Sequence, residues 1–83
     1  MHELSLALEV CRMARERCER AGGTRVVSVG VEVGEDAGIE IENFRFCLTS
    51  LMAEPPFEGA TALLIPNAGG DLRLAYLEVD DGR

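Results

Sequence analysis

The feature that most constrains the fold is a ten-residue segment, residues 25–34, in which apolar residues alternate with polar or small ones. The alternating positions are held by Val27, Val29, Val31 and Val33 on one side and by Ser28, Gly30 and Glu32 on the other. Successive side chains of a β-strand point to opposite faces, so the pattern predicts a strand with one apolar face. The rest of the chain must cover that face.

Two segments with helical spacing of apolar residues can supply the cover. In residues 3–21 the apolar positions recur every three or four residues, and Gly22-Gly23 is typical of a helix end. Residues 41–53 show the same spacing, and Pro55-Pro56 requires that helix to end before it. We therefore expect two amphipathic helices.

Two further strands are predicted near the end of the chain, at residues 58–65 and 72–80. The segment between them, residues 66–71, is dense in turn residues and favours a hairpin. The order is then α-β-α-β-β. We expect one α+β domain spanning residues 1–83, with two helices packed on one face of a three-stranded sheet.

Composition disfavours several classes of protein. The formal net charge of -7 argues against nucleic acid and anionic membranes as partners. No run is long enough to span a bilayer and no basic leader precedes the first apolar stretch, so we expect a cytoplasmic protein. The single histidine leaves no nucleophile–base pair, and we expect no enzyme activity.

The three cysteines, Cys11, Cys18 and Cys47, do not form a Cys-x-x-Cys pair. Structural zinc sites usually depend on such pairs, so the sequence does not support one. Free cysteine behaves as a small apolar residue, and we expect all three to be buried free thiols.

The first three residues, Met1-His2-Glu3, form a compact set of metal ligands. An α-amine with a pKa of about 7.7–8.0 and an imidazole near 6.5 lose their protons readily around neutral pH. The Met1 amine, the His2 peptide nitrogen and the His2 ring can form adjacent chelate rings, which suits square-planar Ni(II) or Cu(II). Glu3 could add an oxygen or orient His2. The alternative is an ordinary frayed terminus.

Several segments resemble the HypA/HybF family of nickel-insertion accessory proteins, in the family's order. They are Met1-His2-Glu3-Leu4-Ser5-Leu6-Ala7, residues 27–35, residues 38–40 followed by 43–46, and the pair 58–60 and 72–79. The resemblance implies an α+β nickel domain whose ligands are Met1, His2 and Glu3. It also suggests Glu40, in the loop before the second helix. For Glu40, a carboxylate that favours the helix N-terminus remains the alternative.

The sequence departs from the family in one place. In the family, a zinc module built on two cysteine pairs lies between the last two strands, whereas only residues 66–71 join them here. We therefore expect a nickel domain without the zinc module and without structural zinc.

By this resemblance the protein is a nickel metallochaperone. It would bind Ni(II) transiently at its N-terminus and help insert it into a nickel-enzyme precursor, such as a [NiFe]-hydrogenase large subunit during maturation. A HypB-type GTPase is a candidate partner. The alternative is a HypA-like scaffold or interaction module in metalloenzyme assembly that no longer carries metal.

Overall fold

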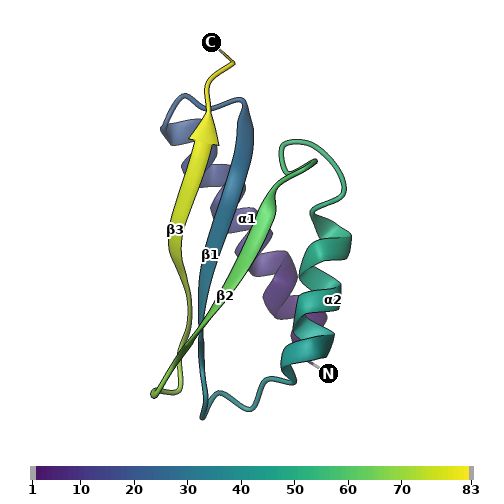
Figure 1. Cartoon of the computed structure of the whole chain (residues 1–83), viewed down its shortest axis with the longest axis vertical. Helices are drawn as coiled ribbons and strands as arrows, with labels where there is room; N and C mark the ends of the chain where they lie inside the picture. The colour runs from purple at the N-terminus through teal and green to yellow at the C-terminus, as the bar shows by residue number, and fades with distance from the viewer. Residues whose placement is uncertain (1, 83) are drawn as a thin grey trace.

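The computed structural model describes residues 2–82, which form a sheet with two helices packed against it (Figure 1). The elements in chain order are α1 (Glu3–Arg20), β1 (Arg25–Gly34), α2 (Ile41–Leu51), β2 (Thr61–Asn67) and β3 (Leu72–Asp80). In Figure 1, α1 runs behind the sheet and α2 lies beside β2. The predicted α+β class and the order α-β-α-β-β are confirmed.

The sheet topology shows that the predicted hairpin is wrong. The strand order is β2-β1-β3, with β2 parallel and β3 antiparallel to β1, so β1 separates the last two strands. Turn residues predict a change of direction, but they do not determine which strand becomes the neighbour. The most regularly apolar strand takes the centre, where both of its edges are paired and one face is buried.

The connection between β2 and β3 is also shorter than expected. β2 continues through Pro66 and Asn67, so residues 68–71 make the connection instead of residues 66–71. This segment passes the end of β1, where the Gly34 N–H donates to the Asp71 carbonyl at 2.7 Å.

A β-bulge modifies the valine alternation in β1. The pairing with β3 shifts between Val26 and Ser28, so Val26 takes the inward position and Val27 is only half-buried. Val29, Val31 and Val33 are buried as predicted. A bulge adds one residue to one strand, which reverses the facing of residues on one side of it.

The core lies between the helices and the sheet and includes the segment after α2. Its largest fully buried side chains are Phe44, Phe57 and Leu48. Cys11 and Cys18 on α1 are buried in it, and burial raises the pKa of both thiols. Cys47 is only half-buried, so the prediction of burial is confirmed for two of the three free cysteines. No helix within residues 2–82 is long and apolar enough to cross a membrane.

The close passage at Gly34 gives a test of the fold. A Cβ at this position would lie 2.3 Å from the Gly69 carbonyl oxygen, whereas a Cβ at Gly70 would meet nothing within 4 Å. We expect Gly34→Ala to lower the free energy of unfolding by about 1–3 kcal/mol, the usual cost of overpacking. Urea denaturation measures it, with Gly70→Ala as the matched control. Equal stability of the two variants would contradict the close passage of the β2–β3 connection at Gly34.

Candidate metal centre

The candidate ligands lie at the first turn of α1 and in the loop that leads into α2. His2 is the N-cap residue of α1, and its carbonyl oxygen accepts a hydrogen bond from the Leu6 N–H at 2.8 Å. Its side chain is exposed and makes no capping hydrogen bond. The imidazole can therefore turn toward an ion without disturbing the helix or the core. Met1 lies outside the described residues, so its amine remains a predicted ligand.

Glu3 occupies a very different environment from His2. Its side chain is only 4% exposed, and it is the buried charged residue of the described chain. Its Oε2 accepts a hydrogen bond from the Glu40 N–H at 3.0 Å, and its Oε1 accepts one from the Asn43 side-chain amide at 3.2 Å. Because buried carboxylates must be hydrogen-bonded, these contacts make its burial tolerable. We call this arrangement, formed by Glu3, Glu40 and Asn43, the Glu3 clasp.

The charged amino terminus and the clasp together keep Glu3 ionised over a wide pH range. The pKa of the Glu3 carboxyl falls from 4.5 to about 2. The positively charged amino terminus is the largest cause, followed by the N–H groups of Glu40 and of Glu3 itself, while burial acts in the opposite direction. An ionised carboxylate only accepts hydrogen bonds, which matches the donors that face it.

Glu40 caps α2. Its carboxylate accepts hydrogen bonds from the backbone N–H of Asn43 at 3.0 Å and of Glu42 at 3.4 Å, which is the usual role of an acidic N-cap residue. The structure thus shows the alternative role that the sequence predicts for Glu40, a carboxylate that stabilises the N-terminus of a helix. Its side chain is exposed, and each carboxylate oxygen has two lone pairs, so capping leaves acceptor capacity for an ion.

The structure brings three of the four predicted site residues to one end of the molecule. Glu3 is hydrogen-bonded to the backbone of Glu40, and His2 directly precedes Glu3 in the chain. Within residues 2–82, no group of three or more His, Cys, Asp or Glu side chains is arranged to hold a metal ion. A complete site at this end therefore needs backbone nitrogens or the Met1 amine as further donors.

Asn43 completes the clasp, although the sequence does not predict it as a site residue. Its side chain donates to Glu3 and its backbone N–H donates to Glu40, so it connects the two carboxylates. The signal was available in part, because an acidic residue three positions before Asn43 is typical of an N-cap. The side-chain bond to Glu3 spans 40 residues and has no local signature.

Comparison with known proteins identifies the family. The family model described as "HypA: Hydrogenase/urease nickel incorporation, metallochaperone, hypA" matches residues 1–72. The hydrogenase maturation factor HypA of Azoarcus sp. is 34% identical over 77 residues, 90% of this chain and 68% of that protein. The factor of the same name from Geotalea daltonii is 38% identical over 71 residues, 83% of this chain and 62% of that protein. The chain belongs to the HypA family.

A solved structure shows the same fold. The solution structure of the Ni metallochaperone HypA from Helicobacter pylori matches with a TM-score of 0.87 and 14% identity, over 96% of this chain and 98% of that chain. The chain spans only 57% of HypA from Chlorobaculum parvum and 62% of the Geotalea protein. The activity of these longer relatives therefore comes to this chain as a proposal.

The low pKa of Glu3 predicts how the clasp responds to acid. A carboxyl whose pKa is depressed in the folded state stabilises the fold above its unfolded pKa and loses that contribution as the pH falls through the folded value. We expect Glu3→Gln to lower the melting temperature at neutral pH. The difference from the native protein should shrink between about pH 4.5 and pH 2.

Thermal denaturation followed by circular dichroism across this pH range measures the difference. Glu42→Gln is the matched control, because Glu42 also lies in the first turn of a helix, here α2, but with its side chain 80% exposed. A difference between native protein and Glu3→Gln that stays constant down to pH 2 would show that the clasp does not depend on the charge of Glu3.

Proposed function

We propose that this protein is a nickel metallochaperone that carries Ni(II) at the start of α1 and passes it to the precursor of a nickel enzyme. The observation that carries the proposal is the contrast between two neighbouring residues. His2 is exposed and makes no capping hydrogen bond, while Glu3 is 4% exposed and tied to α2. A potential ligand thus stands in solvent on a helix start that the Glu3 clasp holds in place.

The helix start also suits backbone coordination. The first N–H groups of an α-helix have no acceptor within the helix. The His2 peptide nitrogen can therefore release its proton to solvent and bind a metal without breaking a helical hydrogen bond. Together with the Met1 amine and the His2 ring it would supply three nitrogens in adjacent chelate rings, a set that favours square-planar Ni(II).

The two carboxylates then take different roles. Glu40 takes part in the clasp through its backbone N–H and its side chain is exposed, so it is the better candidate for an oxygen ligand. Both oxygens of Glu3 already accept hydrogen bonds from α2. We assign Glu3 chiefly to positioning, as residues around a metal site commonly are, and keep it as a weaker candidate ligand.

Release of the ion would proceed by ligand exchange. Exposed donors at a chain terminus can be replaced one at a time by the donors of a receiving site. Cu(II) generally binds such donors more tightly than Ni(II), so selectivity for nickel would depend on geometry and on which metal is available.

The name of the curated relatives, hydrogenase maturation factor, suggests a [NiFe]-hydrogenase large subunit as the receiving protein. A HypB-type GTPase is a second proposed partner. We further propose that the nickel domain works without a zinc module, because residues 68–71 suffice to join β2 to β3 and all three cysteines lie in the helices.

The first test of the proposed site is His2→Ala in the native, untagged protein. We expect Ni(II) affinity to fall by more than roughly 100-fold, because even residues around a ligand cost about 10–100-fold when replaced. The melting temperature should not change, since the His2 side chain is exposed. Calorimetric titration measures the affinity, with the exposed Ser5→Ala as control. Unchanged nickel affinity in His2→Ala would rule out this site.

A second test concerns the amine of Met1. An N-terminal extension converts this amine into an amide, which should weaken nickel binding sharply while the fold stays the same. Titration of one preparation before and after proteolytic removal of the extension makes the comparison. If both forms bind nickel equally, the amine is not a ligand and the proposed chelate rings are incorrect.

A further inference from the structure

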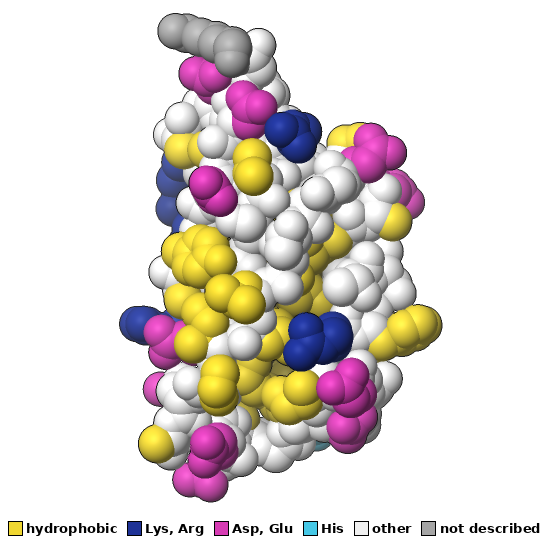
Figure 2. Space-filling view, viewed as in Figure 1, with side chains coloured by type: hydrophobic (Ala, Val, Ile, Leu, Met, Phe, Trp, Pro, Cys, Tyr) yellow, Lys and Arg dark blue, Asp and Glu magenta, His cyan; other side chains and the backbone are white. Residues whose placement is uncertain are grey.

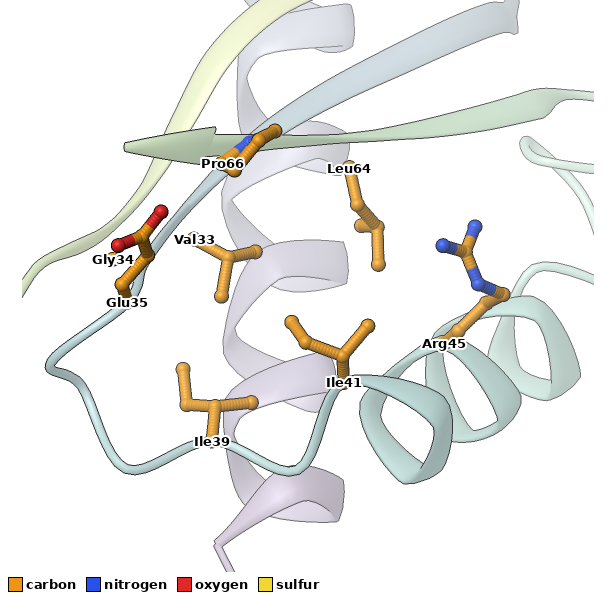
Figure 3. Close-up of a pocket in the computed structure, with 8 residues that line it drawn as sticks. All are labelled: Val33, Gly34, Glu35, Ile39, Ile41, Arg45, Leu64 and Pro66. Atoms are coloured by element: carbon orange, nitrogen blue, oxygen red, sulfur yellow. The ribbon is translucent and has the colours of Figure 1, made fainter. Parts of the chain in front are cut away.

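A groove separate from the start of α1 opens between β2 and α2. It encloses about 280 Å³. In Figure 3 the aliphatic side chains around it point toward one another from β1, β2, the loop and α2; they are Val33, Ile39, Ile41, Leu64 and Pro66. Figure 2 shows hydrophobic side chains lining a recess in the lower half of this face. The groove remains open because α2 packs mainly on α1 and only loosely on β2.

One wall of the groove is a free sheet edge. β2 is the outermost strand next to α2, and its only strand neighbour within residues 2–82 is β1. Every second residue of an edge strand directs its N–H and C=O groups away from the sheet, where another strand can pair with them.

The two edges of the sheet differ in charge. Edge strands usually carry charged residues that discourage pairing. β3 follows this rule with Arg73, Glu78 and Asp80, whereas β2 contains no charged residue and exposes half of Leu63. Pro66 interrupts only the end of the edge. The β2 edge is therefore open to a further strand in a way that the β3 edge is not.

A basic group stands at one end of this groove. In Figure 3, Arg45 lies on α2 beyond Ile41, with its guanidinium beside Leu64. Its ion pair with Glu42 is long, at 3.9 Å, and the Glu42 side chain is 80% exposed, so the pair neutralises little of its charge. Glu35 lines the opposite end of the groove, so Arg45 is the one basic group among the lining residues and favours an acidic group of the occupant at its own end.

We infer that the groove binds an extended peptide segment of a partner protein, which adds to β2 as a fourth strand. Its inward side chain would be apolar and enter the groove, and an acidic side chain two positions away would meet Arg45. This spacing fits because same-face residues of a strand are about 6.6 Å apart, and Ile41 and Arg45, four residues apart on a helix, are separated by about 6 Å.

Strand addition is a recurrent mode of peptide recognition, in which backbone hydrogen bonds give affinity and side-chain pockets give specificity. Outward-facing side chains of the peptide would pack beside Leu63. A second copy of this chain fits less well, because its own β2, Thr61–Asn67, has no acidic residue to offer Arg45.

Selection from a displayed library of random octapeptides tests the inference on the full chain. The native protein should enrich sequences with a bulky apolar residue and an acidic residue two positions apart. Arg45→Glu should lose the acidic preference and select basic residues instead. Ile41→Glu should abolish enrichment, and an acidic residue in the first turn of α2 is compatible with the helix.

Arg20→Glu and Leu8→Glu are the matched controls, because each makes the same change at an exposed position on α1. Both should select the same peptides as the native protein. Circular dichroism verifies that every variant is folded. Absence of enrichment with the native protein, or an unchanged acidic preference in Arg45→Glu, would overturn the inference.

Nuclear magnetic resonance then shows where the most enriched peptide binds on the protein. Backbone amide signals of Thr61–Ile65 and Ile41–Arg45 should shift, and Arg45→Glu should weaken binding at least tenfold, or about 1.4 kcal/mol. Shifts confined to β3 would overturn the inference. The inference would also be overturned if the β2 signals shift with increasing protein concentration when no peptide is present. Such shifts would show that a second copy of the chain occupies the groove.

Discussion

The Glu3 clasp is the interaction on which the arrangement of the functional end depends. One buried carboxylate holds the backbone of Glu40 and the side chain of Asn43, so the first turn of α1 and the start of α2 are fixed to each other. Burying a charged carboxylate without hydrogen bonds would cost much free energy. Glu3 is stable in its buried position because other groups donate hydrogen bonds to it. The clasp therefore defines where His2 stands and where the loop before α2 ends.

The same loop connects the candidate metal site with the groove. Glu40 caps α2 and is part of the clasp, while its neighbours Ile39 and Ile41 line the groove. A peptide held on β2 would thus lie close to the metal ligands proposed at the start of α1. The proposed role as a nickel carrier fits this arrangement, because such a carrier must hold its ion loosely and bring it near a receiving protein.

Much of the fold follows from local patterns in the sequence. The alternation in residues 25–34 predicts β1 with its observed bounds, and helical spacing predicts α1 and α2 to within two residues. Pairing partners are not local, which is why the parallel β1–β2 pair was missed and a hairpin was expected. The candidate site, like the fold, is predictable from the sequence only in part. The sequence predicts His2, Glu3 and Glu40 as ligands, which lie at one end of the molecule, but the burial of Glu3 and the role of Asn43 depend on contacts about 40 residues apart.

The most direct test of the central claim is a map of the backbone amide signals by nuclear magnetic resonance as Ni(II) is added to the native protein. The account predicts one-to-one binding, with changes concentrated in Leu4–Ala7 and Ile39–Asn43, on the two sides of the clasp. Changes concentrated elsewhere, for example around the acidic pair Asp80–Asp81, would contradict it. So would the absence of any change at the start of α1.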